Sequence, residues 1–375
     1  MESFDVAVIG GGIIGTSAAS YLAEAGRSVV LIERAELAAG ASGRNSGAVQ
    51  HPFDGRFAEL HKQSLALYRE LSAAEDGFEL PERPSGLLLV SFDEGAAVNA
   101  AAQLAREWPE LAPAVLPAGA AATLEPALAE GLAACRVETG YPVAPSAATL
   151  AFARRAGRSG ARFVTGTAAT PIVESGRVTG VLLETGDAIG SGQVLVAAGP
   201  WTPSLIAGWS RHPFITSLWG VVVATRLATP PAHVLEELGI DSQDFRDGRV
   251  FSLVSVGVSS SIGSTFLTDE PDPAVIAPGI IDRARAFVPA LANAAIESFR
   301  ACARPMTRDG SPVIGAVPEI EGLFVCAGHG PWGISTGPAS SRMVSDQMLG
   351  LASQSAEYAP ARVLADMQRR DTEIA

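Results

Sequence analysis

Cysteine is scarce in this sequence, and the few cysteines are not arranged for disulfides or metal. The 375 residues include 3 cysteines, Cys135, Cys302 and Cys326, an odd number without paired spacing. Disulfide-stapled folds and zinc sites use paired, closely spaced cysteines. We therefore expect neither a disulfide framework nor a metal site.

Long apolar runs and a secretory leader are also missing. The best candidate run, residues 5–19, is interrupted by glycines and is too short to span a bilayer. The first residues lack the basic segment and the apolar segment of a signal peptide. We expect a cytoplasmic protein without a transmembrane segment.

Acidic residues outnumber basic ones in this sequence, and lysine is almost absent. Lysine and arginine total 27 against 40 aspartates and glutamates, which gives a formal net charge of −13, and Lys62 is the single lysine. Proteins that bind nucleic acid neutralise its phosphates with a basic surface. We expect no nucleic-acid partner, although a buried arginine still suits an anionic small molecule.

Apolar residues, in contrast, are plentiful. Hydrophobic residues make up 47% of the chain and charged residues 18%, a composition that supports a large core and excludes a disordered chain. A chain of this length is longer than a single hydrophobic core usually supports, so we expect two domains.

The N-terminal segment has the pattern of a βαβ unit. Residues 5–9 form an apolar run typical of a buried parallel strand, and a glycine-rich turn follows. Residues 13–25 have a helical pattern, and residues 27–33 form a second buried strand. This order of elements predicts a Rossmann-type crossover.

The turn of this unit carries the spacing Gly10-x-Gly12-x-x-Gly15. The three glycines permit a tight turn, approach of the backbone to a pyrophosphate and close helix packing, while the helix N-terminus attracts phosphates. Glu33 ends the second strand, where a carboxylate accepts hydrogen bonds from a ribose. We expect an adenine dinucleotide here, with an unrelated glycine turn as the alternative. The predicted contacts are Gly10, Gly12, Ile13, Ile14, Gly15, Glu33 and Arg34.

Small residues fill the next segment, residues 38–47, which we expect to form a loop. A loop in this place suits the phosphate and ribityl portion of an extended FAD, and it favours FAD over NAD. A flexible surface loop is the alternative. The predicted contacts are Ala41, Ser42, Arg44, Asn45, Ser46 and Gly47.

Two later segments each place a glycine turn after a buried strand. They are residues 194–201 (VLVAAGPW) and 323–333 (LFVCAGHGPWG), and a helix is expected from about Pro338. Backbone amides in such turns stabilise negative charge on a polar ring edge, here the N1/O2 edge of a flavin. Ordinary sheet strands with packing glycines are the alternative. The predicted contacts are Ala168, Ala198, Gly199, Trp201, Gly328, His329, Gly330, Trp332, Gly333 and Ile334.

The rest of the chain alternates such elements with β-rich insertions. Helical patterns cover residues 57–71, 150–161 and 277–287, and β-rich runs cover residues 219–226 and 250–258. We expect an α/β protein, α+β in its two-domain organisation. It combines a Rossmann-type FAD-binding domain, assembled from discontinuous segments, with a β-rich substrate domain.

Together these motifs resemble the D-amino acid oxidase superfamily of FAD-dependent oxidoreductases. The branch they resemble contains glycine oxidase, monomeric sarcosine oxidase and the smaller subunits of proline and opine dehydrogenases. The resemblance covers nearly the whole chain, through VIGGGIIG, GASGRNSG, VLVAAGPW, RPMTRDGSPVIG and FVCAGHGPWGISTGP. It implies an FAD-binding domain of residues 1–82, 141–212 and 301–375 and a substrate domain of residues 83–140 and 213–300.

The resemblance also implies the chemistry. Relatives of this kind oxidise the C–N bond of a small amino acid or secondary amine by hydride transfer from Cα–H to flavin N5, and the resulting imine hydrolyses. The electrons pass to oxygen, a quinone or a partner subunit. Arg304 resembles the arginine that grips the substrate carboxylate in a bidentate fork. A structural ion pair with Asp309 is the alternative.

Cys302 occupies a position similar to that of the flavin-linked cysteine in monomeric sarcosine oxidase. Glycine oxidase has a small residue there and holds FAD without a covalent bond. We expect non-covalent FAD, with a covalent link through Cys302 as the alternative.

Two features depart from the resemblance. No tyrosine lies in residues 213–300 to close a substrate pocket, and Lys62 does not match the lysine that promotes oxygen reaction in sarcosine oxidases. An FAD-dependent 2-hydroxy acid (C–O) dehydrogenase and a flavin-carrying subunit of a larger dehydrogenase therefore stay open beside the amine hypothesis.

Overall fold

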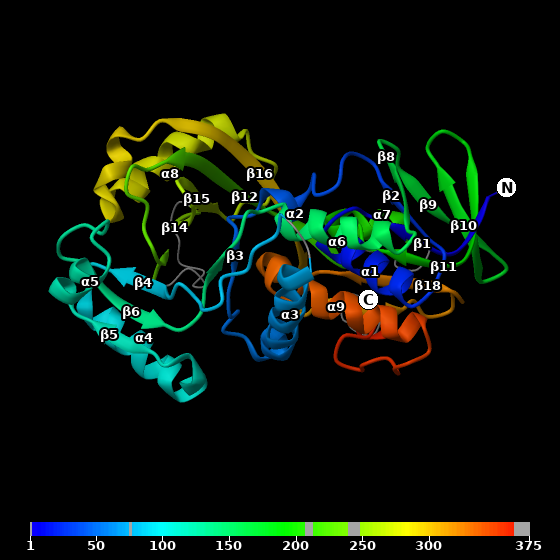
Figure 1. Cartoon of the computed structure of the whole chain (residues 1–375), viewed down its shortest axis with the longest axis horizontal. Helices are drawn as coiled ribbons and strands as arrows, with labels where there is room; N and C mark the ends of the chain where they lie inside the picture. The colour runs from blue at the N-terminus through cyan, green and yellow to red at the C-terminus, as the bar shows by residue number, and fades with distance from the viewer. Residues whose placement is uncertain (1, 75–76, 207–212, 239–247, 364–375) are drawn as a thin grey trace, which may run out of the picture.

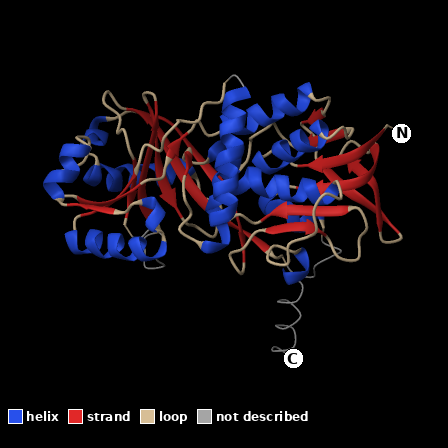
Figure 2. Cartoon of the chain, turned by 60° about the horizontal axis from the view of Figure 1, so that its bottom comes forward, coloured by secondary structure: helices blue, strands red, loops and turns tan. Residues whose placement is uncertain are grey.

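Two large sheets organise the molecule. The structure, a computed structural model, describes residues 2–74, 77–206, 213–238 and 248–363. Figure 1 shows two bodies side by side along the long axis, each built on one sheet. Helices lie beside each sheet, as Figure 2 shows.

The first sheet contains the predicted βαβ unit. Its 8 strands are β1 (Ser3–Ile9), β2 (Val29–Glu33), β8 (Arg162–Thr165), β9 (Ala169–Glu174), β10 (Arg177–Leu183), β11 (Ala188–Val196), β17 (Val313–Ala316) and β18 (Leu323–Ala327). The order is β17-β18-β11-β1-β2-β8, with β10 antiparallel to β11 and β9 antiparallel to β10. β1 is parallel to β2 and β11, and β11 is parallel to β18. The apolar runs are buried because helices cover the parallel strands.

Four helices accompany this sheet. They are α1 (Ile13–Glu24), α3 (Gly55–Ala74), α6 (Ala147–Arg158) and α9 (Gly333–Met348). Helix α1 packs against α6 and α9, and α9 packs against α3. The fully buried Tyr68 and Phe152 belong to the core that these helices share with the sheet.

The second sheet also has 8 strands. They are β4 (Leu87–Ser91), β5 (Ala114–Leu116), β6 (Ala133–Val137), β12 (Ile215–Arg226), β13 (Val234–Glu237), β14 (Arg249–Val256), β15 (Ser259–Thr265) and β16 (Ile296–Thr307), in the order β16-β12-β15-β14-β13-β4-β6-β5. Helices α4 (Glu94–Glu107), α5 (Ala118–Leu124) and α8 (Pro273–Phe287) belong to this body. The shorter elements are α2 (Ala41–Arg44), β3 (Ala48–Val49), β7 (Tyr141–Pro142) and α7 (Thr202–Leu205).

Strand β16 links the two bodies. It pairs antiparallel with β12 along nearly its whole length, from Ile296 to Thr307. The domain boundary expected between residues 300 and 301 falls inside this continuous strand. Within the described ranges, no helix has both the length and the apolar character needed to cross a membrane.

The sequence suggested a loop for residues 38–47, but part of this segment is helical. Residues Ala41–Arg44 form the short helix α2. The Asn45 side-chain amide donates to the carbonyl oxygens of Ala41 and Ser42 at 3.1 and 2.8 Å, which satisfies two carbonyls at the end of this helix. Small polar residues therefore stabilise a helical turn here.

The last helix begins earlier than Pro338, at Gly333. A proline inside a helix leaves the carbonyl four residues before it without its usual amide donor. That carbonyl is Ile334 O, and it accepts a hydrogen bond from the Tyr68 hydroxyl at 2.7 Å. A side chain from α3 thus replaces the missing donor, a contact that no local pattern indicates.

Candidate functional site

A cavity of about 880 Å³ lies between the two sheets. Its first wall is the carboxyl edge of the parallel strands, represented by Ile9, Glu33 and Ala327. Its second wall is one face of the second sheet, which includes Ser252 and Arg304. Ligands of open α/β sheets bind in this position, outside the carboxyl ends of the strands.

The glycines of the first turn have distinct geometric roles. Gly10 has φ +118°, and a Cβ there would lie 2.4 Å from the carbonyl oxygen of Ala197. A Cβ at Gly15 would lie 1.9 Å from Gly10 O, so only glycine lets α1 pack this closely. Gly12 lines the cavity, and a Cβ there would approach Ser42 Oγ at 3.0 Å.

The N-terminus of α1 lies at the cavity. Gly12 supplies no side-chain cap, and the first turn contains no acidic residue. The Ser42 hydroxyl accepts the Ile13 amide at 2.9 Å. Glu33 Oε2 accepts the Gly11 amide at 2.6 Å, which holds this carboxylate beside the turn. The helix N-terminus and the space left by Gly12 fit a pyrophosphate, and the Glu33 carboxylate fits a neighbouring ribose.

Helix α2 joins this region to the second sheet. The Arg44 guanidinium donates to Ala301 O at 3.3 Å. A second hydrogen bond runs in the opposite direction, from Arg300 Nη2 to Asn45 O at 2.8 Å. Gly47 does not line the cavity. It has φ +89°, and a Cβ there would lie 2.4 Å from Val143 O, so glycine is needed for the turn itself.

The two later glycine turns also reach the cavity. His329 is 2% exposed, and its ring Nε2 lies 2.9 Å from Ser340 Oγ. Burial lowers the pKa of His329 to about 4, so the ring is neutral near pH 7. Gly328 packs against Thr307, where a Cβ would come within 2.5 Å of a methyl carbon, and it does not line the cavity.

Most predicted cofactor contacts meet at this cavity. Three of them, Gly15, Gly47 and Gly328, instead shape the turns behind it. The predicted residues in the lining are Gly10, Gly12, Ile13, Ile14, Glu33, Arg34, Ala41, Ser42, Arg44, Asn45, Ser46, Ala168, Ala198, Gly199, Trp201, His329, Gly330, Trp332, Gly333 and Ile334.

Arg304 lies on the cavity face of β16. Its Nη1 donates to Thr265 O at 2.8 Å and its Nη2 to Ser264 Oγ at 2.7 Å. The guanidinium lies 4.6 Å from the centre of the Phe266 ring. It also crosses Gly220, where a Cβ would lie 2.2 Å from Nη2. These contacts fix the orientation of the Arg304 guanidinium. Among the described residues, no carboxylate forms an ion pair with it.

Burial lowers the pKa of Arg304 from its ordinary value, since desolvation disfavours its charge. An arginine nevertheless stays protonated at neutral pH. The cavity therefore holds a fixed, partly desolvated cation that suits a carboxylate in bidentate geometry.

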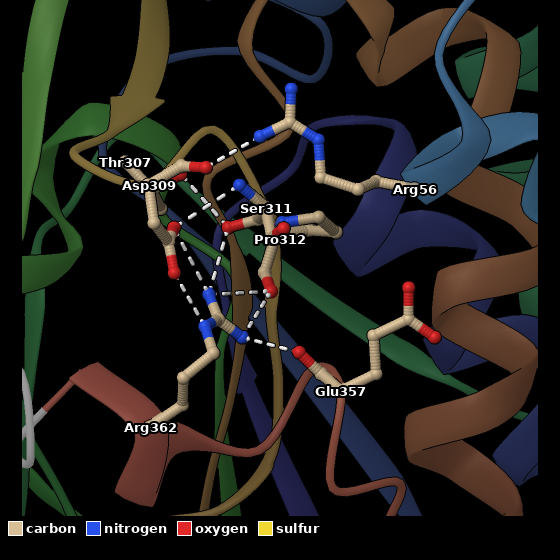
Figure 3. Close-up of polar contacts among 7 residues, drawn as sticks. All are labelled: Arg56, Thr307, Asp309, Ser311, Pro312, Glu357 and Arg362. Atoms are coloured by element: carbon tan, nitrogen blue, oxygen red, sulfur yellow. Dashed lines mark hydrogen bonds and ion pairs between the residues drawn. The ribbon is translucent and has the colours of Figure 1, made fainter.

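Asp309 forms its ion pair with Arg362, not with Arg304. Arg362 Nε donates to Asp309 Oδ2 at 2.5 Å. Its other nitrogens donate to the main-chain oxygens of Ser311, Pro312 and Glu357, a cluster that Figure 3 shows around the guanidinium. Asp309 and Arg362 do not line the cavity. Their contacts with each other and with the main chain of Ser311 and Pro312 stabilise the turn after β16.

Replacement of Arg362 by leucine is expected to destabilise the protein without changing the cavity. The variant removes several charge-assisted hydrogen bonds, and roughly 1–2 kcal/mol of unfolding free energy should be lost, because Asp309 is 40% exposed and water screens part of the effect. The midpoint of thermal unfolding measures this loss and should be lower in Arg362→Leu than in the wild type. Arg177→Leu, in a pair whose side chains are 64% and 66% exposed, should change the midpoint much less; equal shifts would contradict the assignment.

Sequence patterns missed several residues of the second wall. Aromatic residues of the lining are Trp219 and Phe266, which come from residues 213–300 where the sequence has no tyrosine, and Phe53, which comes from the loop after β3. Gln50 and Glu236 also line it, and Gln50 Nε2 donates to Glu236 Oε1 at 2.9 Å. The one local signal was the pair of glutamates ending the apolar strand VLEE, since charge on a central strand points to a polar lining.

Cys302 lies two residues before Arg304 and lines the same cavity. Its side chain is buried, with the residue 5% exposed. All three cysteines are free thiols, and Cys326 of β18 lines the same cavity.

Comparisons with known proteins agree with this geometry. Residues 5–347 match the DAO family model, described as FAD dependent oxidoreductase. The glycine oxidase of Geobacillus kaustophilus is 29% identical over 362 residues, covering 92% of this chain and 92% of that protein.

Solved structures show the same architecture. The glycine oxidase of Bacillus cereus superposes with a TM-score of 0.78 at 27% identity, over 93% of this chain and 96% of that one. The L-proline dehydrogenase of P. horikoshii, at 22% identity, shares the fold with a TM-score of 0.83, over 97% of this chain and 99% of that one.

Proposed function

This chain belongs to the DAO family of FAD-dependent oxidoreductases, and from that premise we propose that it oxidises the C–N bond of a small amino acid or secondary amine. The observation that carries the proposal is Arg304, a fixed guanidinium on the cavity wall opposite the glycine turns. Relatives named glycine oxidase support an amino acid as the substrate.

We propose that FAD lies along the first wall. The N-terminus of α1 receives the pyrophosphate, and Glu33 accepts hydrogen bonds from the ribose. The turns at Gly199 and Gly330 present backbone to the flavin ring, in accordance with their place in the lining. When bound, FAD supplies the acceptor for the hydride of the amine Cα–H.

Arg304 then positions the substrate. A carboxylate bound by its fork lies over β12 and β15, with its Cα held at one place in the cavity. The Phe266 ring covers the guanidinium with aromatic surface, which excludes water and strengthens the charge pair. The oxidised product is an imine, which hydrolyses.

Flavin bleaching tests the proposed function. Under anaerobic conditions, amino acids, N-methyl amino acids, proline or opines should reduce the bound flavin. Bleaching by 2-hydroxy acids, with none by any amine, would overturn the proposal. Activity that requires a co-purifying larger partner would instead identify a subunit of a dehydrogenase.

The electron acceptor is a separate question. Lys62 lies exposed on α3, and the described lining of the cavity contains no lysine. Oxygen, a quinone and a partner subunit are the candidate acceptors. Rates of reoxidation of the bleached protein by oxygen and by a soluble quinone distinguish an oxidase from a dehydrogenase.

We predict that FAD is held without a covalent bond. Acid or heat denaturation should release the yellow flavin into the supernatant, because the contacts proposed above are hydrogen bonds and packing. Colour that stays with the precipitated polypeptide in the wild type and is lost in Cys302→Ala would establish the covalent link instead.

A further inference from the structure

A phenylalanine in a left-handed backbone conformation, Phe53, lines the cavity at the end away from Arg304. We propose that Phe53 limits how long a side chain the substrate can carry, and that His51 holds Phe53 in place. The inference rests on the proposed function, because it takes Arg304 as the residue that binds the α-carboxylate. It makes Phe53 a specificity-determining residue and His51 a positioning residue.

The backbone of Phe53 has a conformation that aromatic residues rarely adopt. Its φ is +53°, in the left-handed region that glycine, asparagine and aspartate prefer. Of the five non-glycine residues with positive φ in the described ranges, Phe53 is the aromatic one and the one that lines the cavity. Such a conformation persists only where the surrounding contacts impose it, and it is frequent at ligand sites.

His51 supplies a contact that imposes this conformation. Its Nδ1 accepts the Phe53 amide at 3.1 Å, and the two rings meet edge to face with their centres 5.4 Å apart. Burial lowers the pKa of His51, so the ring is neutral near pH 7 and Nδ1 keeps the lone pair that this hydrogen bond needs. The His51 amide donates to Thr139 Oγ1 at 2.7 Å, and the His51 ring centre lies 4.5 Å from that of Trp108. His51 is therefore fixed by its own contacts, and it fixes Phe53 in turn.

Phe53 completes an apolar surface at this end of the cavity. Five residues of the lining belong to one hydrophobic cluster or pack against it: Ala48, Phe53, Leu89, Ala100 and Leu104. They come from β3, the loop after it, β4 and α4. The surface is therefore assembled from both sides of the cavity end, and the part that projects from the loop is the Phe53 side chain.

Helix α4 shows where this end reaches solvent. Four residues at the i, i+3, i+4, i+7 spacing of one helix face line the cavity, namely Ala100, Gln103, Leu104 and Glu107. Gln103 and Glu107 are exposed, and Gln103 Nε2 donates to Glu107 Oε1 at 3.1 Å. The cavity thus opens beside α4, and the apolar surface that contains Phe53 lies at this opening.

This surface is separated from Arg304 by the width of several strands. Leu89 in β4, Glu236 in β13 and Ser252 in β14 are successive partners in register, so they share one face of the sheet. The Arg304 fork is bonded to β15, the strand next to β14. Three strand spacings therefore lie between the fork and β4, roughly 14 Å at ordinary spacing. Ser252 and Leu89 both line the cavity, so the open space follows this face.

A substrate held by Arg304 has its α-carbon at one end of this face. A side chain that extends from this carbon toward β4 reaches the apolar surface, and each methylene buried there should improve kcat/KM about fourfold. The improvement ends where the chain meets the Phe53 ring, because overpacking against a fixed group is unfavourable. The substrate class that fits is an amino acid with an unbranched apolar side chain of limited length.

A series of unbranched amino acids measures this limit. Alanine, 2-aminobutyrate, norvaline, norleucine and 2-aminooctanoate, each as separate enantiomers, are mixed anaerobically with the FAD-loaded protein, and flavin reduction is followed at limiting concentration. In the wild type the rate should rise along the series and then fall. In Phe53→Ala the maximum should move to a longer chain, and the longest acid should gain roughly tenfold relative to alanine.

Two further variants accompany Phe53→Ala. Phe53→Gly opens the same space, and glycine adopts a positive φ without strain, so it should show the same shift even if Phe53→Ala folds poorly. Phe92→Ala is the matched control, because Phe92 is a 58% exposed aromatic residue of the second body that does not line the cavity. It should keep the wild-type profile.

His51 has a test of its own. His51→Leu removes the acceptor of the Phe53 amide, so the limit on chain length should relax as it does in Phe53→Ala. His51→Asn should restore most of the wild-type profile, because an asparagine side chain accepts the amide two residues further on. An unchanged profile in His51→Leu would overturn the role assigned to His51.

The same chain-length maximum in the wild type, Phe53→Ala and Phe53→Gly would overturn the inference. Loss of flavin from both Phe53 variants would also overturn it, since Phe53 would then lie against the cofactor. Either result, with bleaching by amino acids, leaves the proposed function intact. Bleaching by no amine in any of these proteins would reject both.

Discussion

Replacement of Gly12 by valine should strip the protein of FAD. A Cβ at this position lies 3.0 Å from Ser42 Oγ, and the two methyl groups of valine would enter the space at the N-terminus of α1 where we place the pyrophosphate. Overpacking of this kind costs about 1–3 kcal/mol, which corresponds to a roughly 10- to 100-fold weaker Kd for the cofactor. The flavin-to-protein absorbance ratio after purification, and FAD titration of the apoprotein, measure the effect.

Gly192→Val is the control for this variant. Gly192 lies in β11 of the same sheet, is exposed, and has no neighbour within 4 Å of a Cβ. It should retain the wild-type flavin content. The thermal midpoints of the two apoproteins separate loss of the phosphate site from loss of the fold. Full FAD occupancy and unchanged affinity in a folded Gly12→Val protein would show that the phosphates bind elsewhere.

Replacement of Arg304 by leucine should remove most of the activity toward amino acids. The variant leaves the substrate carboxylate without a partner in a partly desolvated site. Losing such a charged contact costs on the order of 3 kcal/mol, or about a hundredfold in kcat/KM. Lysine at this position should restore only part of the rate, because it keeps the charge and loses the planar fork.

Two comparisons separate a substrate role from a structural one. Flavin content of Arg304→Leu should stay near the wild-type value, and Arg226→Leu, an exposed arginine on the adjacent β12 that pairs with Glu297, should keep full activity. An amino acid and its decarboxylated amine should then respond differently, with the loss confined to the acid. Equal losses for both compounds would make Arg304 a structural residue and remove the main support for the amino acid proposal.

Local patterns were sufficient for the βαβ unit at the N-terminus. The strand, turn and helix of residues 5–25 follow from an apolar run and from glycines whose roles are steric, as Gly10 and Gly15 demonstrate. The early start of α9 was not accessible in this way, because the hydroxyl that compensates for Pro338 comes from Tyr68 in another helix.

The sequence by itself therefore determined the parts of this protein that depend on neighbouring residues: the βαβ unit, its glycine turn and the acid that ends the second strand. Tertiary structure decided which charged residues face one another. It paired Asp309 with Arg362 and brought Gln50 against Glu236 across 186 positions of chain. The face that a strand residue presents, and the partner it meets there, are set by the register of strands distant in sequence, so no local pattern specifies them.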